Sequence, residues 1–186
     1  MWDVGICENL RFSPELCQEI NANKDKGEES CGLNKAKLWE CNDDNCSMGP
    51  EKCTNRFITN IGQYELFVRD EGILGLGLVL GRKPVPAKDI FLGELTGRVR
   101  LRDDSVVSNY IAEFGDKLML DGEHSRNPFN YLNHSCRPNA KFVLWYSAGG
   151  EPRLCVFSTK KIKPNTPLTI CYGKTATLFF KDGICL

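Results

Sequence analysis

Cysteine thiols are concentrated at the N-terminal end of this sequence. Six of the ten cysteines precede residue 54, and Cys41-x4-Cys46-x6-Cys53 is their tightest grouping. No histidine lies near them. A structural zinc ion is typically held by four such thiolates in a tetrahedron. The six candidate zinc ligands are Cys7, Cys17, Cys31, Cys41, Cys46 and Cys53.

The six thiols leave several alternatives open. They could serve one zinc ion with two thiols to spare, or two zinc ions that share bridging sulfurs. Buried free thiols, and the disulfides of a secreted protein, are the other interpretations. Residues 1–20 contain no apolar core of a signal peptide. This favours a reducing compartment, where clustered thiols bind metal more often than they form disulfides.

A second group of polar, aromatic and thiol side chains lies at residues 131–139. It includes Tyr131, Asn133, Cys136 and His134, which is one of only two histidines in the chain. The triplet Asn133-His134-Ser135 fits the pattern for N-glycosylation, which would require a secreted protein. A hydrogen-bonded histidine in the core is the other ordinary explanation.

Short runs rich in β-branched and aromatic residues follow residue 63 and predict a mostly β (α+β) domain. Glycine and proline separate the runs at intervals of about ten residues, which is typical of turns. The predicted strands are 64–68, 77–80, 90–95, 117–120, 141–146, 153–158 and 167–171. A helix is expected only at 106–114, with a short turn at 128–132, and the charged run at 24–29 is expected to be a loop.

Length and composition predict one domain with a small appendage. The 186 residues are 41% hydrophobic, which is enough for a sizeable core, whereas residues 1–60 need a metal or disulfides to be stable. No apolar stretch approaches the roughly 20 residues of a membrane span. The 24 basic and 24 acidic residues balance. We therefore expect neither membrane association nor direct sequence-specific binding to nucleic acid.

The pattern Asn133-His134-Ser135-Cys136-x-Pro138-Asn139 resembles the signature of SET-domain protein lysine methyltransferases. Other pieces follow in the family's order. They are Gly75-Leu76-Gly77-Leu78, similar to a Gly-x-Gly loop, then Phe91 to Gly97, Leu120-Asp121, and Pro167-Leu168-Thr169-Ile170-Cys171-Tyr172-Gly173.

The upstream segment from Glu40-Cys41 to Phe57 is similar to the AWS zinc-binding segment, which precedes the SET domain in enzymes acting on lysine thirty-six of histone H3. It is more loosely similar to the pre-SET of the lysine-nine enzymes. The whole resemblance covers residues 40–174.

The resemblance implies an AWS/pre-SET-like zinc module at 1–60 and a SET-domain β-fold with a pseudoknot-like signature segment at 61–174. Residues 175–186 would begin a truncated or absent post-SET segment. The implied activity is transfer of methyl groups from S-adenosylmethionine to a lysine of a histone tail, most often histone H3 or the nucleosome. The implied location is chromatin in the nucleus.

The resemblance also assigns roles to residues. The cofactor-binding set is Gly75, Leu76, Gly77, Tyr131, Asn133, His134 and Tyr172. Tyr172 is expected to be catalytic, and Tyr110 is expected to line the lysine channel. Cys136 and Cys185 are expected to share a post-SET zinc ion. Turn glycines and a packing tyrosine at the end of a strand are the ordinary alternatives.

Several residues depart from the family pattern: Leu95, Arg98, Asn130 and Cys171. The departure at Leu95, together with the truncated or absent post-SET segment, motivates the alternative of a catalytically silent SET-like module that binds chromatin or acts as a scaffold. Ile170 lies where a tyrosine tends to limit the family to one methyl group, so di- or trimethylation is expected. Cys155 and Cys171 are expected to be core thiols in strands.

Overall fold

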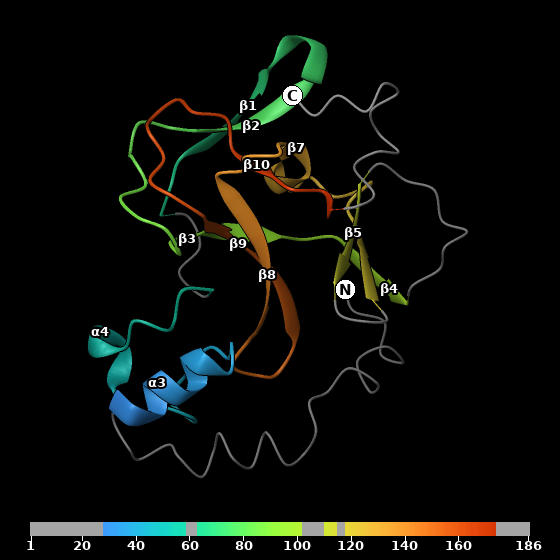
Figure 1. Ribbon diagram of the computed structural model, residues 1–186. Helices are drawn as coiled ribbons and strands as arrows, with labels where there is room; N and C mark the ends of the chain where they lie inside the picture. The colour runs from blue at the N-terminus through green and yellow to red at the C-terminus, as the bar shows by residue number, and fades with distance from the viewer. Residues whose placement is uncertain (1–27, 59–62, 102–109, 115–117, 174–186) are drawn as a thin grey trace. The chain divides into compact units, whose positions relative to one another are not determined.

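The computed structural model describes residues 28–58, 63–101, 110–114 and 118–173 (Figure 1). They belong to two compact units. The first unit comprises 1–61, 97–123 and 144–154, and the second comprises 62–96, 124–143 and 155–186. Among the described residues, no helix is both long and apolar enough to cross a membrane.

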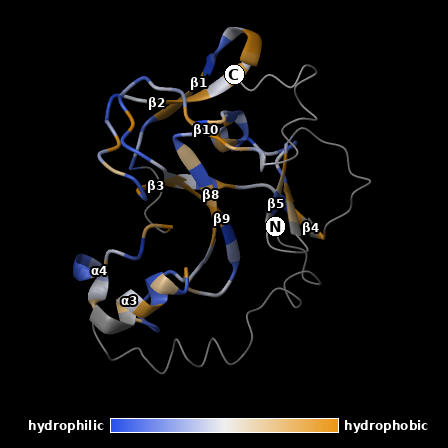
Figure 2. Cartoon of the chain, viewed as in Figure 1, coloured by the Kyte–Doolittle hydropathy of each residue, from blue (hydrophilic) through white to orange (hydrophobic). Residues whose placement is uncertain are grey.

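The second unit contains an antiparallel hairpin of β1 (Leu66–Asp70) and β2 (Leu76–Leu80). The last three residues of β2, Leu78 to Leu80, are fully buried and form part of the core. A 3-10 helix at Gly72–Leu74 makes the turn between the two strands. Figure 2 shows hydrophobic residues at this turn, where Ile73 is 89% exposed.

A three-stranded sheet has the order β3–β9–β8. Its strands are β3 (Phe91–Leu95), β9 (Pro152–Ser158) and β8 (Ala140–Tyr146). All residues of β3 and most of β9 are buried, as expected for strands rich in leucine, valine and phenylalanine. The rings of Phe91 and Phe157 meet edge to face at 5.6 Å.

The signature segment consists of short elements. A 3-10 helix at Pro128–Tyr131 leads into β7 (Asn133–His134), and β7 pairs in parallel with β10 (Thr169–Ile170). The residues just beyond β10 therefore lie next to the residues of β7.

The first unit contains the two helices of the described residues, α3 (Glu28–Ala36) and α4 (Gly49–Lys52). It also contains an antiparallel sheet in the order β4–β6–β5. Its strands are β4 (Arg98–Leu101), β6 (Leu118–Asp121) and β5 (Ile111–Phe114). Trp39 forms an isolated parallel bridge with Tyr146 at the end of β8.

The mostly β fold is confirmed, and each predicted strand overlaps an observed one. The helix predicted at 106–114 is wrong over its described part, because Ile111–Phe114 is strand β5, and 102–109 lie outside the described residues. The expectation of no other helix is also wrong. Residues Glu28–Ala36 form α3. The short turn expected at 128–132 is confirmed as the 3-10 helix at Pro128–Tyr131.

Candidate functional site

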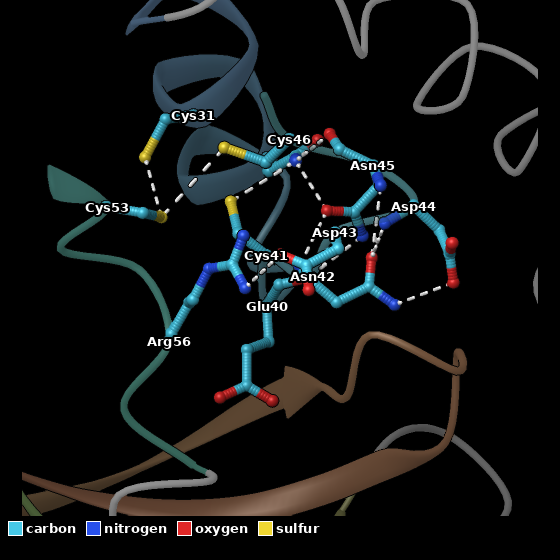
Figure 3. A network of polar contacts seen from close by, with 11 residues as sticks. Cys31, Glu40, Cys41, Asn42, Asp43, Asp44, Asn45, Cys46, Cys53 and Arg56 are labelled. Atoms are coloured by element: carbon cyan, nitrogen blue, oxygen red, sulfur yellow. Dashed lines mark hydrogen bonds and ion pairs between the residues drawn. The ribbon is translucent and has the colours of Figure 1, made fainter. Parts of the chain in front are cut away.

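Four cysteines converge in the first unit, and their sulfur atoms point toward one another (Figure 3). Cys31 comes from α3, Cys41 and Cys46 from the following loop, and Cys53 from the end of α4. All four are buried free thiols, and their sulfur atoms lie within 4.8 Å of one another.

The sulfur spacing fits a tetrahedral zinc ion. Zinc–sulfur bonds of about 2.3 Å place tetrahedral sulfurs about 3.8 Å apart. The Sγ of Cys53 lies 3.5 Å from that of Cys31 and 3.9 Å from that of Cys46. The buried Glu40 points away from the sulfur atoms (Figure 3), so it is not a ligand.

The electrostatics of the thiol cluster also favour a cation. Burial, together with the neighbouring Cys53, raises the pKa of Cys31 to about 11. Burial also raises the pKa of Cys41. Burial acts in the same direction on Cys53, but hydrogen bonds from the Asn55 backbone, Cys31 and Arg56 outweigh it and lower its pKa. Four crowded thiolates need a compensating cation, and zinc supplies two positive charges.

Two fully buried asparagines surround the thiol cluster. The Nδ2 group of Asn34 donates to the Sγ of Cys41 at 3.3 Å, and that of Asn55 donates to the same sulfur at 3.2 Å. The Asn55 Nδ2 also donates to the Trp39 carbonyl at 2.7 Å. Hydrogen bonds of this kind orient metal ligands and stabilise their negative charge.

The thiol cluster is attached to the end of β8 within the first unit. Trp39 stacks on Tyr146 with ring centroids 6.1 Å apart, and Phe57 meets Trp145 edge to face at 4.8 Å. The Glu40 backbone amide donates to the Tyr146 carbonyl at 2.8 Å. Aromatic packing therefore fixes both ends of the loop that carries Cys41, Cys46 and Cys53.

The second candidate site lies in the second unit, where the predicted glycine loop meets β7. The Nδ2 group of Asn133 donates to the Leu76 carbonyl at 3.3 Å. Gly77 is packed so closely that a Cβ would lie 2.7 Å from the Cγ of Glu71 and 3.1 Å from the Asn133 Nδ2. Gly75 has a φ of +70°, and a Cβ there would meet no atom within 4 Å. The main chain at Gly75 is thus open to a ligand.

Tyr172 is held against the same segment. Its backbone amide donates to the Nδ1 of His134 at 3.0 Å, and its hydroxyl donates to the Leu132 carbonyl at 2.6 Å. The rings of His134 and Tyr172 are tilted against each other, with centroids 5.3 Å apart. The β7–β10 pairing, which aligns Ile170 with His134, makes these contacts possible.

Polar side chains fix the signature segment at both ends. Before it, the Asn127 side chain accepts from the Phe129 amide and donates to the Glu94 carbonyl. After it, the Asn139 side chain donates to the Pro167 carbonyl at 2.8 Å and accepts from the Thr169 amide at 2.9 Å. Each asparagine therefore ties the segment to a neighbouring strand or loop.

The structure brings together six of the predicted cofactor-binding residues: Gly75, Leu76, Gly77, Asn133, His134 and Tyr172. Tyr131 ends the 3-10 helix two residues before β7. Tyr110 belongs to the first unit, where it is 42% exposed and precedes β5. Its role in a lysine channel stays a prediction.

The remaining cysteines have mixed outcomes. Cys7, Cys17 and Cys185 lie outside the described residues. Cys136 is disulfide-bonded, and a disulfide sulfur offers no thiolate to a metal, so its zinc ligation stays a prediction for the reduced protein. Cys155 is fully buried in β9, as expected. Cys171 is exposed just beyond β10, so its prediction as a core thiol is wrong.

The residues that sequence reasoning missed are mostly asparagines. Asn34 and Asn127 lie outside the quoted motifs and carry no signal of their own. Asn55 and Asn139 do fall within the motifs, at Cys53-x-Asn55 and at the end of the signature. Their place there is a signal that could have identified them as structural polar residues.

Comparison with known proteins agrees with this geometry. The SET domain family matches residues 11–173. Over 81% of its own length, this chain is 30% identical to the histone-lysine N-methyltransferase ash1 of Drosophila melanogaster. Over 82% of its own length, it is 29% identical to the histone-lysine N-methyltransferase ASHR3 of Arabidopsis thaliana. It is 23% identical over 86% of its length to the "Histone-lysine N-methyltransferase, H3 lysine-36 specific" of Candida albicans.

The matches cover 7%, 33% and 20% of these three relatives, so the chain spans a third or less of their length. The family match, in contrast, extends over most of this chain and includes the whole described signature segment. The resemblance of the motifs is thereby confirmed, and this chain belongs to the SET domain family.

Proposed function

We propose that this chain transfers methyl groups from S-adenosylmethionine to a lysine side chain of a histone tail. The observation that carries the proposal is the convergence of the glycine loop, the signature segment and Tyr172. The histone-lysine methyltransferases among the relatives support the same chemistry.

The open main chain at Gly75 fits a bound cofactor. Residues of the glycine loop together with Tyr131, Asn133 and His134 would hold S-adenosylmethionine, with Tyr172 beside it. When bound, this cofactor supplies a methyl group on a sulfonium centre, which needs no catalytic metal. The protein's task is then to orient the reactants and exclude water.

Tyr172 is suited to act as a hydrogen-bond acceptor toward the substrate. Its hydroxyl proton is already donated to the Leu132 carbonyl. In this orientation its oxygen would accept from the N–H or C–H groups of the reactants. A lysine amine must lose its proton before it can attack, and transfer from water into an apolar channel lowers its pKa.

The degree of methylation is proposed from Ile170. This residue is 5% exposed, and it stands opposite His134 in the register of β10 and β7. Because isoleucine has no hydroxyl group, it cannot hold a water molecule beside the amine. We therefore expect two or three methyl groups to be added.

The preferred substrate is histone H3, free or in the nucleosome. Lysine thirty-six is favoured, because the spacing of Cys41, Cys46 and Cys53 is similar to that of the AWS segment. The relative from Candida albicans carries this specificity in its name. Lysine nine is the competing target. Such a substrate implies a nuclear, chromatin-associated protein.

The thiol cluster is proposed to hold one structural zinc ion through Cys31, Cys41, Cys46 and Cys53. Their mutual spacing supports a single four-cysteine site. The division into a zinc module at 1–60 and a SET domain at 61–174 is part of the same proposal.

The deciding experiment is incubation with labelled S-adenosylmethionine and histone H3 or nucleosomes. Tyr172→Phe should lower turnover at least about 100-fold, on the scale of a lost electrostatic contact to the transition state. Its cofactor affinity should stay similar. Tyr64→Phe is the matched control, because it removes the hydroxyl of a buried tyrosine that lies under the Lys83 ammonium and outside the candidate site. Normal turnover by Tyr172→Phe would remove this residue from the mechanism.

Two further measurements test the substrate and the product. Nucleosomes with arginine in place of lysine thirty-six, or of lysine nine, should identify the target by loss of label. Intact-mass analysis should show two or three methyl groups, and a product that stops at one would contradict the role of Ile170. Cofactor binding without label transfer to any histone would instead support the silent chromatin-binding module.

A further inference from the structure

We propose that the imidazole of His134 is a positioning group for Tyr172, holding the backbone of the tyrosine through Nδ1. The inference rests on the proposed methyltransferase function, and it assigns to His134 a role in addition to cofactor binding. The starting observation is the 3.0 Å hydrogen bond from the Tyr172 amide to the Nδ1 of His134.

The Tyr172 amide determines which nitrogen of the His134 imidazole accepts a hydrogen bond. A backbone amide can only donate, so Nδ1 must present its lone pair to Tyr172. The ring proton then lies on Nε2, which is 3.7 Å from the Sγ of Cys136. His134 is only 8% exposed, so both ring nitrogens face protein groups.

Tyr172 needs such a contact because the strand before it is short. β10 ends at Ile170, and Gly173 directly after Tyr172 has a φ of +73°, so the chain turns away from the sheet. The bond to His134 replaces the ladder hydrogen bond that a longer strand would have supplied.

The tyrosine is thereby held at two points by one short segment. His134 binds its backbone amide, and the Leu132 carbonyl accepts its hydroxyl. Loss of the first contact removes a hydrogen bond that holds the backbone end of the tyrosine. A displacement of about 1 Å in a catalytic group can cost about 100-fold in rate.

The test uses three substitutions that differ in where they place an acceptor. The Oδ1 of His134→Asn can take the place of Nδ1, His134→Gln reaches toward Nε2, and His134→Leu has no acceptor. We expect kcat, measured at saturating cofactor so that a change in cofactor Kd does not enter, to fall about 10- to 100-fold in the leucine and glutamine variants. His134→Asn should recover most of this loss.

The proposal is wrong if the asparagine and glutamine variants lose the same amount of kcat. It is equally wrong if weaker cofactor binding accounts for the whole loss. Because asparagine and glutamine are both polar amides, this comparison remains informative even if His134→Leu does not fold.

A spectroscopic measurement separates this inference from the proposed function. The chain has five tyrosines, so ¹⁵N-tyrosine labelling gives few backbone amide signals, and Tyr172→Phe assigns the relevant one. In His134→Gln, the chemical shift of the Tyr172 amide should change strongly, and this amide should exchange its hydrogen with solvent faster. Neither change is expected in His134→Asn. If the wild-type protein does not methylate any histone, the proposed function fails. The amide signal of Tyr172 still shows whether the hydrogen bond between His134 and Tyr172 exists.

Discussion

The buried amide of Asn55 offers a direct test of how the zinc site is stabilised. Its Nδ2 group donates to the Sγ of Cys41 at 3.2 Å and to the Trp39 carbonyl at 2.7 Å, and the side chain is fully buried. Asn55→Ala removes both hydrogen bonds without touching a sulfur ligand. We expect weaker zinc binding and lower stability.

The size of the effect follows from the contacts. Loss of an outer-shell partner typically weakens metal binding about 10- to 100-fold, which corresponds to about 1.4 to 2.7 kcal/mol. Asn34 still donates to Cys41 in this variant, which favours the lower end of that range. The double variant Asn34→Ala/Asn55→Ala should reach the upper end. The Trp39 carbonyl also loses its Asn55 partner, so the free energy of unfolding should fall by about 1 to 3 kcal/mol.

Competition with a chelator of known affinity measures the zinc Kd, and chemical denaturation measures stability. Asn139→Ala is the matched control, because Asn139 is also buried but its side chain bonds to the Pro167 carbonyl and the Thr169 amide instead of a sulfur. That variant should lose stability and keep its zinc affinity. If Asn55→Ala binds zinc within about twofold of wild type, or if both variants lose zinc affinity equally, the proposed role of the asparagine amides is refuted.

Two further substitutions test the two sites separately. Cys46→Ser removes a zinc ligand, so it should lower zinc content by atomic emission and reduce the thermal midpoint, whereas Cys155→Ser changes an equally buried thiol outside the cluster and should keep its zinc. Gly77→Ala places a Cβ 2.7 Å from the Cγ of Glu71 and should weaken cofactor binding measured by calorimetry by about tenfold, in line with the cost of overpacking. Gly149→Ala, whose Cβ would meet nothing closer than 3.5 Å, should bind normally, and equal affinities of both glycine variants would contradict the close packing at Gly77.

The sheets could be predicted where strands are long and apolar. Residues such as Leu78 to Leu80 and the run in β9 are buried because their side chains are hydrophobic, and that signal is local. The segment Ile111–Phe114 is wrongly predicted because four residues, Ile-Ala-Glu-Phe, are too few for their period to distinguish a helix from a strand. Its pairing with β6, a tertiary contact, decides for the strand.

The helix α3 was missed for a related reason. Its sequence contains Gly32 and several polar residues, so its intrinsic helix propensity is modest. Two of its residues contact the thiol cluster: Cys31 contributes a sulfur, and Asn34 donates to Cys41. Short helices gain most of their stability from such packing, which the local sequence does not reveal.

The catalytic geometry lies further beyond sequence reasoning than the fold does. Motif resemblance grouped His134 with Tyr172, but the two residues are 38 positions apart, and their contact depends on two-residue strands. Strands that short have no detectable alternation of side chains. Buried asparagines such as Asn139 hold these segments together instead of long ladders of backbone hydrogen bonds. The position of Tyr172 therefore depends on individual polar side chains. Substituting one of them should displace Tyr172 before it disturbs the packing of the apolar core.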